Sequence, residues 1–365
     1  MANAIGPTEA IPFWARATPF LACALAVSMV AGLVPAHPIV LTAAALLLGA
    51  SVFASVHYAD TIALKVGEPL GSIVLAIAVT VIEVALIVSI MVGGASASGE
   101  LARDTVFATV MIVLNGIIGL CLVLGGARHF EQSFQTSAAT IALSVLGTLA
   151  TITLVLPNYT LTTSGPTYAT SQLMFVSLAS LVLYGVFLFV QTVRHRYYFT
   201  TEPGAGESAH AVPSNRITAL SLVLLIVSLT GVVLLAKALS PALEGAIRSA
   251  GLPASFVGVV IAAIVLLPEG MAAIRSATAN QLQTSLNLAL GSAMASIGLT
   301  IPVVSAVSVF LDNPLTLGLS PAQMALLILS LFIATVSLAT GRTTILQGTV
   351  HLVIFATFLF LAAVP

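Results

Sequence analysis

Residues 65–94 read KVGEPLGSIVLAIAVTVIEVALIVSIMVGG, and beyond Glu68 the only charged residue in this run is Glu83. A helix of about 20 such apolar residues is long enough to cross about 30 Å of hydrocarbon. Similar apolar runs recur along the whole chain. The sequence therefore predicts a protein that spans a membrane many times.

The composition of the whole chain leads to the same conclusion. Of its 365 residues, 59% are hydrophobic and 6% are charged, and the mean hydropathy is +1.15. A soluble domain carries about 25% charged residues, so this chain cannot cover a water-facing surface. The formal net charge is −1 and no basic block is present, so nucleic acid is not an expected partner. Cys23 and Cys121 lie in apolar runs and lack the spacing of a zinc site.

The predicted fold class is an all-α polytopic membrane protein with about eleven transmembrane helices. Charged, Pro-rich or Gly-rich stretches divide the apolar runs at 18–34, 38–59, 70–93, 104–126, 136–156, 170–192, 217–239, 253–274, 284–310, 321–340 and 343–363. The longest connector, residues 193–215, is hydrophilic and reads as a flexible loop between two halves.

Four parts of the chain follow from this division. Residues 1–37 form an N-terminal segment with the first helix, 38–192 a five-helix repeat, 193–216 a cytoplasmic loop, and 217–365 a second five-helix repeat. A repeat with an odd number of helices lies in the opposite orientation the second time. Inverted repeats of this kind are common in secondary transporters, whose ion site lies at the bilayer midplane.

The distribution of Lys and Arg predicts the orientation, because these residues collect in cytoplasmic loops. With the N-terminus in the cytoplasm, the cytoplasmic side holds Arg16, Lys65, Arg128, Arg194, Arg196, Arg216, Arg275 and Arg342. The other side holds Arg103, Lys237 and Arg248. We therefore expect a periplasmic C-terminus in a bacterial inner membrane. Arg16 and the short apolar run after it also fit a signal sequence, which leaves open whether the first helix is retained.

Glu83 and Glu269 are the acidic residues that lie well inside predicted helices. A charge at the bilayer centre costs at least about 2.5–3.5 kcal/mol, so each carboxylate needs a bound cation or a proton. A low-dielectric site holds either of these but poorly both, which is the chemistry of an exchanger. The alternative for each residue alone is a helix-packing group that is hydrogen-bonded to a neighbour.

The residues around each glutamate also fit a binding site. Pro268 and Gly270 flank Glu269 and predict a helix break, which would expose backbone oxygens as ligands. Thr80 lies three residues before Glu83 on the same helix face, so its hydroxyl could bind the ion or orient the carboxylate. A packing role for Thr80 remains equally open. His351, in the last predicted span, is either a hydrogen-bonded interface histidine or a proton relay.

Three separated stretches resemble the cation/proton exchanger branch of the calcium/cation antiporter superfamily. They are residues 65–94, residues 102–119 (ARDTVFATVMIVLNGIIG), and LLPEG at 266–270 followed by LQTSLNLALGSAMASIGLTIPVV at 282–304. More closely, the chain looks like the bacterial calcium/proton and sodium-potassium/proton antiporters. The eleven spans, divided into one plus five plus five, agree with that family.

The resemblance implies that Glu83 and Glu269 bind the transported metal ion and protons. It also implies supporting oxygen ligands at Asn115 and at Ser292 or Ser296. An alternative interpretation makes Asn115 an interhelical hydrogen-bond donor and residues 291–298 a close-packing seam of small residues. Calcium exchangers of this branch commonly have Gly-Asn ahead of each glutamate, where this chain has Val79-Thr80 and Val265-Leu266. Because Ca²⁺ prefers six to eight oxygens, this departure leaves Na⁺ or K⁺ open.

The predicted function is secondary active antiport of Ca²⁺, Na⁺ or K⁺ against protons. A passive cation channel is the first alternative, although channels usually place carboxylates in rings or filter loops. An intramembrane enzyme is the second, but no paired-Asp, HExxH or GxSxG motif supports it. The expected partners are inorganic cations, protons and the lipid bilayer. No cofactor is expected, and a homo-oligomer is left open.

Overall fold

The computed structural model describes residues 11–35, 37–67, 70–92, 98–199, 213–311 and 314–365. In the first half of the chain the helices are α1 (Phe13–Val30), α2 (Pro38–Val66), α3 (Leu70–Val92), α4 (Ser98–Met111), α5 (Ile118–His129), α6 (Thr136–Ala150), α7 (Thr170–Phe189) and α8 (Arg196–Phe199). In the second half they are α9 (Asn215–Ser249), α10 (Phe256–Thr278), α11 (Leu282–Ala295), α12 (Ile301–Leu311), α13 (Pro321–Leu338) and α14 (Ile345–Ala363). Two short strands, β1 (Gln132–Ser133) and β2 (Arg342–Thr343), pair in antiparallel fashion.

Several helices continue through wider or tighter turns without leaving the helical path. Within the described ranges, four segments are π-helical: Ile112–Ile117, Thr151–Val155, Val190–Arg194 and Ser296–Thr300. The π-helical segment Thr151–Val155 is followed directly by a 3₁₀ turn at Leu156–Tyr159. As a result, α4 and α5 form one span, Gly99–His129, and α11 and α12 form another, Leu282–Phe310.

The described residues contain ten helical runs that are long and apolar enough to cross a membrane, and α3 adds the shorter apolar stretch Ala76–Ser89. Each corresponds to one predicted span, which confirms the all-α polytopic class. The largest difference in bounds is at α9, which continues ten residues past the predicted end at 239. Pro241 lies inside this helix. The helix tolerates it because a proline removes only one backbone donor and the flanking turns can still form.

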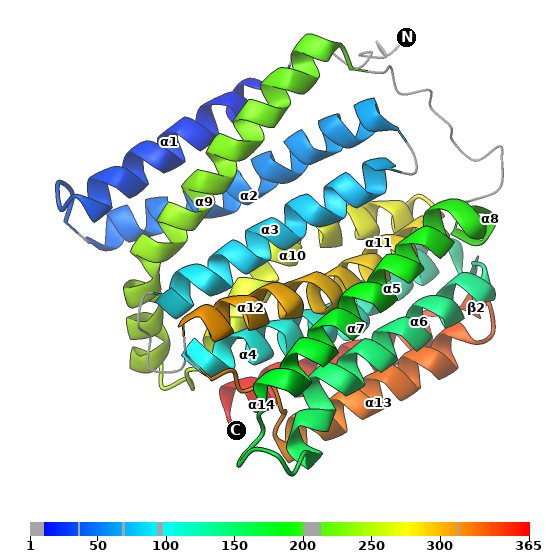
Figure 1. Ribbon diagram of the computed structural model, residues 1–365. Helices are drawn as coiled ribbons and strands as arrows, with labels where there is room; N and C mark the ends of the chain where they lie inside the picture. Colours follow the sequence, from blue (N-terminus) through cyan, green and yellow to red (C-terminus); the bar gives the residue numbers. More distant parts are fainter. Residues whose placement is uncertain (1–10, 36, 68–69, 93–97, 200–212, 312–313) are drawn as a thin grey trace, which may run out of the picture. The chain divides into compact units, whose positions relative to one another are not determined.

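The helices group by contact into two compact units, and each is described by itself. Unit 1 comprises Met1–Ser89 and Glu202–Leu243, and unit 2 comprises Ile90–Thr201 and Glu244–Pro365. Both units therefore draw helices from both halves of the chain (Figure 1). The predicted parts follow chain order instead. Of the predicted loop at 193–216, the residues at 200–212 lie outside the described ranges.

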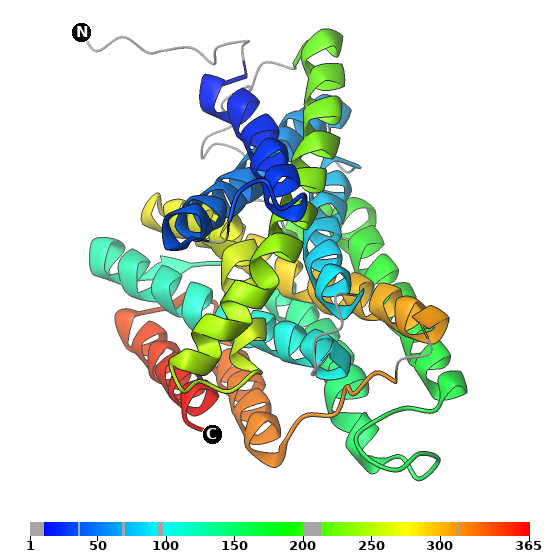
Figure 2. The same ribbon diagram turned by 90° about the vertical axis from the view of Figure 1, so that its left-hand side faces the viewer.

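Unit 1 is held together by an apolar cluster and by serine contacts between helices. The cluster contains Ile11, Ala15, Ala54, Tyr58, Ile62, Leu224 and Leu225, with Val74 of α3 packed against it. Ser55 of α2 donates a hydrogen bond to Ser228 of α9 (2.9 Å), and the Ser228 hydroxyl donates to the Ser51 carbonyl (2.9 Å). Figures 1 and 2 show α1, α2 and α9 side by side. Such interhelical hydrogen bonds are typical of membrane helices.

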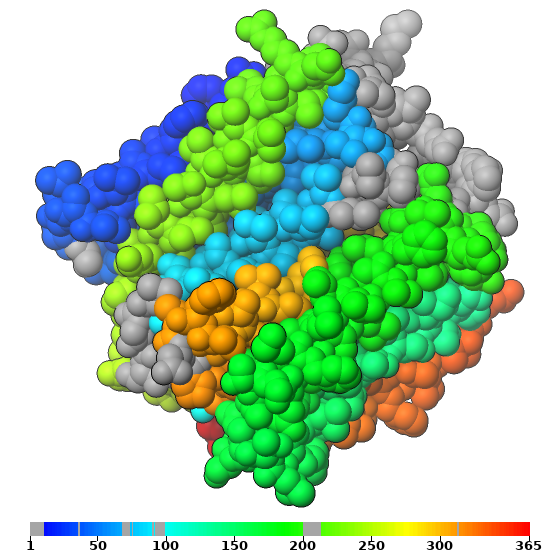
Figure 3. All heavy atoms as spheres, in the orientation of Figure 1, coloured from blue at the N-terminus to red at the C-terminus, as the bar shows by residue number. Residues whose placement is uncertain are grey.

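Unit 2 is built around the span that α4 and α5 form. Of this span's apolar window, 89% is buried, so it contacts protein on almost every side. α10 packs along α4 and α5, α14 packs along α5, and α11 packs against α10 and α6. On the face shown in Figure 3, α7 (green) and α12 (orange) lie side by side.

The helix ends of unit 2 gather into two separate clusters. At one end, the β1–β2 ladder joins the turns after α5 and α13, and the Gln132 amide donates to the Ala277 carbonyl at the end of α10 (2.8 Å). At the other end, backbone hydrogen bonds connect the segment before α13 to two other spans and to the loop before α7: Thr316 to Gly99 (3.0 Å), Leu319 to Leu154 (2.9 Å) and Gly318 to Pro166 in the loop (3.0 Å). Successive spans run antiparallel, so their connections fall in turn at one end of the unit and then at the other.

Candidate functional site

Glu269 and Ser292 come together because α10 and α11 form a tight helical hairpin. The turn between them is short and includes Asn280 in the left-handed region (φ 62°). Glu269 lies nine residues before the end of α10 and Ser292 ten residues after the start of α11. At 1.5 Å per residue, both side chains lie about 14 Å from the turn. The Ser292 hydroxyl donates a hydrogen bond to Glu269 Oε2 (2.9 Å).

The helix around Glu269 is continuous, which differs from the predicted break. α10 runs through Pro268 and Gly270 without interruption. Pro268 removes only its own backbone donor, and the neighbouring turns remain α-helical. Gly270 instead allows a close approach, since a Cβ atom there would lie 3.2 Å from Ile117 Cδ1. The π-helical segment that contains Asn115 therefore packs directly beside the Glu269 turn.

Asn115 is fully buried in this π-helical segment and joins three spans. Its Nδ2 donates to Ser330 Oγ of α13 (2.8 Å), and its Oδ1 lies 3.1 Å from His351 Nδ1 of α14. The interhelical hydrogen-bonding role considered for Asn115 is thus present. The interface role considered for His351 is also present, since His351 is completely buried in this contact.

Ser296 begins the second relevant π-helical segment and is buried. Two residues later, Gly298 packs against Tyr184 of α7, where an added Cβ would lie 2.6 Å from Tyr184 Cβ. Segments of this kind occur often at functional sites, because the wider turn re-aims side chains and frees backbone groups. Two of the three predicted supporting ligands in unit 2 therefore lie in π-helical segments.

Tyr184 was not identified by the sequence reasoning. Its side chain is buried in α7 and packs against Gly298 of the π-helical segment that begins at Ser296. The signal available in the sequence was a lone phenol inside the apolar run LVLYGVFLF, residues 181–189. A hydroxyl within a lipid-spanning segment requires a polar partner, just as a carboxyl group does.

Glu83 and Thr80 lie on α3 in unit 1. Both side chains are buried. The Thr80 hydroxyl donates to the Ala76 carbonyl one turn earlier (2.8 Å). Its proton is therefore used within the helix, while its oxygen lone pairs remain suited to a cation rather than to a carboxylate.

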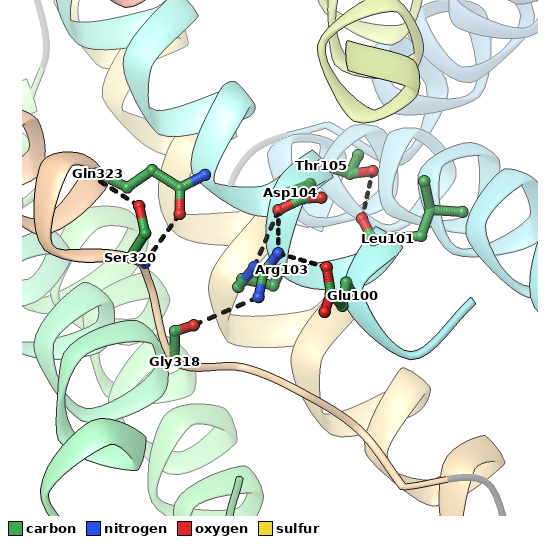
Figure 4. A network of polar contacts seen from close by, with 8 residues as sticks. All are labelled: Glu100, Leu101, Arg103, Asp104, Thr105, Gly318, Ser320 and Gln323. Carbon is green, nitrogen blue, oxygen red and sulfur yellow. Dashed lines mark hydrogen bonds and ion pairs between the residues drawn. The ribbon is translucent and has the colours of Figure 1, made fainter. Parts of the chain in front are cut away.

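Asp104, which begins the fourth predicted span, has a different environment from Glu269. Figure 4 shows Arg103 between two carboxylates, with Nε donating to Asp104 (2.9 Å) and Nη2 to Glu100 (3.0 Å). Its Nη1 also reaches the Gly318 carbonyl (3.5 Å). Because a guanidinium already neutralises Asp104, this cluster joins helix ends and does not resemble an exchangeable cation site.

Ten described helical runs that are long and apolar enough to cross a membrane, with a carboxyl group hydrogen-bonded to a serine between two of them, are typical of a multi-pass membrane transporter. A family model described as "Sodium/calcium exchanger protein" matches residues 36–193 and 220–364. The chain belongs to this family of cation exchange transporters.

Relatives from several bacteria support this assignment. The chain is 54% identical over 359 residues to the y4hA protein of Sinorhizobium fredii, with 97% of each covered. It is 34% identical to the sodium-potassium/proton antiporter ChaA of Escherichia coli, with 85% of this chain and 84% of ChaA covered. It is 27% identical to a Ca²⁺/H⁺ antiporter of Aphanothece halophytica, with 84% and 86% covered.

Two solved structures share the fold. The native YfkE structure has a TM-score of 0.73 at 16% identity and covers 95% of this chain and 100% of YfkE. The H⁺/Ca²⁺ exchanger CAX has a TM-score of 0.70 at 14% identity and covers 95% of this chain and 88% of CAX. The relatives are transporters, and the chain is a transporter rather than an enzyme.

Proposed function

We propose that this transporter is a secondary active antiporter that exports Ca²⁺, Na⁺ or K⁺ from the cytoplasm in exchange for protons. Glu83 and Glu269 are its cation- and proton-binding carboxylates in this proposal. The observation that carries this proposal is the hydrogen bond that the Ser292 hydroxyl on α11 donates to the Glu269 carboxylate on α10. The names of ChaA and the Aphanothece halophytica antiporter support proton coupling.

The cycle follows from competition at the carboxylates. A cytoplasmic cation binds and displaces the protons, the helices rearrange, and periplasmic protons displace the cation outward. Without a bound cation or protons, the carboxylates would carry uncompensated charge in a low-dielectric medium. This cost opposes rearrangement of the helices while the site is empty. The inward proton gradient then drives cation export.

The proposed location is a bacterial inner membrane, with the N-terminus in the cytoplasm and the C-terminus in the periplasm. The Lys and Arg distribution supports this orientation. The two ranges matched by the family model, 36–193 and 220–364, support two related groups of five helices. The chain has Val79-Thr80 and Val265-Leu266 where calcium exchangers of this branch commonly have Gly-Asn. The site therefore offers fewer side-chain oxygens than Ca²⁺ prefers, so Na⁺ and K⁺ are candidate substrates beside Ca²⁺.

The test is cation-dependent proton movement in everted membrane vesicles, with Ca²⁺, Na⁺ and K⁺ added separately. Wild type is compared with Glu83→Gln and Glu269→Gln, and Glu100→Gln serves as a control because its side chain is 52% exposed. We expect one or more cations to dissipate the pH gradient in wild type and the control and to have no effect in the two other variants. Activity that survives in Glu83→Gln or Glu269→Gln would exclude that residue from the site. Cation flux without proton movement would indicate a channel.

A further inference from the structure

The hydrogen bonds of Asn115 use most, but not all, of its bonding capacity. A side-chain amide has two donor hydrogens and two acceptor lone pairs. One donor of Asn115 goes to Ser330 Oγ (2.8 Å), and the other has Met111 Sδ at 3.9 Å. One lone pair of Oδ1 faces His351 Nδ1 (3.1 Å). Among the described residues, a single lone pair on this fully buried amide oxygen is left without a partner, and an amide oxygen is the kind of group that binds a cation.

The direction in which this amide points is determined by Ser330. The Ser330 hydroxyl donates its proton away from Asn115, to the Leu326 carbonyl (2.7 Å) or to Met111 Sδ (3.4 Å). In either case Ser330 Oγ is left as an acceptor, so it must face the NH₂ end of Asn115. With the Ser330 proton donated to Leu326 or Met111, an amide rotated by 180° would bring two acceptor oxygens together.

His351 completes the arrangement from the opposite side. Because the Asn115 oxygen faces His351 Nδ1, that nitrogen must carry the hydrogen and donate it. Within the described residues, His351 Nε2 has no hydrogen-bond partner, which agrees with a tautomer whose proton is on Nδ1. Ser330, with its proton donated away from Asn115, thus orients the Asn115 amide, and the amide oxygen in turn selects the tautomer of His351.

The segment that carries Asn115 adjoins the helices of the candidate site. Gly270, next to Glu269, packs against Ile117 of the same π-helical segment. α11, which carries Ser292, also contacts this segment. The oriented amide therefore belongs to the same region of unit 2 as the Glu269–Ser292 pair.

We propose that Ser330 and His351 are positioning residues of the cation site, which hold the Asn115 amide so that its one unused group is an oxygen acceptor. This inference rests on the proposed function. Residues that orient metal ligands in this way typically account for about 10- to 100-fold in affinity or activity when they are replaced.

The experiment measures the KM and maximal rate for each active cation in everted vesicles. Ser330→Ala and His351→Leu remove the two contacts, whereas Ser330→Thr retains the hydroxyl and His351→Asn retains a donor near the Nδ1 position. Ser305→Ala is a matched control, since Ser305 is a buried serine of α12 with no hydrogen-bond partner among the described residues. We expect the first two variants to raise KM by about 10- to 100-fold and the conservative variants to restore it.

A second measurement separates positioning from general stability. The double variant Asn115→Leu/Ser330→Ala should have the same KM as Asn115→Leu alone. Ser330 acts through Asn115, so the effects of the two substitutions do not add. A KM that is unaffected by Ser330→Ala and His351→Leu, while melting temperature falls, would overturn the inference. A further rise in KM in the Asn115→Leu background would do the same. Absence of exchange in wild type would instead refute the proposed function.

Discussion

The contact between Ser292 and Glu269 pairs a hydroxyl with a carboxyl group on two neighbouring apolar helices. Both side chains are half-buried, and the Ser292 hydroxyl gives the Glu269 carboxylate a hydrogen bond of 2.9 Å. Hydrogen bonds to charged groups contribute about 1.5–3 kcal/mol, more than those between neutral groups. Under the proposed function, loss of the Ser292 hydroxyl is therefore expected to weaken cation binding at Glu269.

We predict that Ser292→Ala raises the KM for the transported cation by about tenfold or more, since it removes a hydrogen bond to a charged group. The same vesicle assay provides the measurement. Ser292→Thr retains the hydroxyl and should keep KM within a few-fold of wild type. Equal KM values in wild type and Ser292→Ala would show that this hydrogen bond does not contribute to cation binding.

At the scale of the elements, glycines decide how closely α5 and α14 approach. A Cβ at Gly348 would lie 2.6 Å from the Val123 backbone nitrogen, and one at Gly126 would lie 2.8 Å from the Ile345 nitrogen. No side chain fits at these positions, so the backbones of the two helices touch. Membrane helices use small residues for such approaches, because van der Waals contact replaces the hydrophobic effect as a source of stability.

Gly348→Ala is expected to destabilise the protein by about 1–3 kcal/mol, because the added methyl group meets rigid backbone. Thermal unfolding in detergent measures the effect. Gly147→Ala on α6 is the matched control, since nothing lies within 4 Å of the added Cβ. There, the higher helix propensity of alanine should stabilise the protein by up to about 1 kcal/mol. A melting temperature for Gly348→Ala at or above that of wild type would contradict the observed packing.

The same scale shows which features could be predicted from sequence. Hydropathy located the spans and singled out Glu269, because a carboxyl group in an apolar run differs sharply from its neighbours. The π-helical segments at 112–117 and 296–300 were not predicted, since their residues are as apolar as those of the adjoining α-helices. The contacts of Asn115 were also not predictable in detail. Ser330 and His351 are 215 and 236 residues away along the chain, and only tertiary packing brings them together.

At the scale of the whole molecule, the predicted orientation places the turn after α5 in the cytoplasm and the turn before α7 in the periplasm. These turns offer exposed positions for labelling. Leu161 is fully exposed, and the Glu131 side chain is 49% exposed. The two positions therefore report on opposite sides of the membrane.

We predict that Leu161→Cys reacts with a membrane-impermeant thiol reagent in intact cells, whereas Glu131→Cys reacts only in everted vesicles. Both variants are made in a background of Cys23→Ala and Cys121→Ala, and that background alone is the control for unspecific labelling. The opposite pattern would invert the proposed topology.

The buried span Gly99–His129 has a consequence for how the protein is made. Its mean hydropathy of 2.5 is as high as that of spans that face lipid, although 89% of its apolar window ends up surrounded by protein. The sequence of this span is therefore apolar enough to be surrounded by lipid during insertion and by neighbouring helices in the folded protein. From its hydropathy, the span is expected to insert into the bilayer on its own. It exchanges lipid for helix contacts only when α10 and α14, which are synthesised much later, arrive beside it.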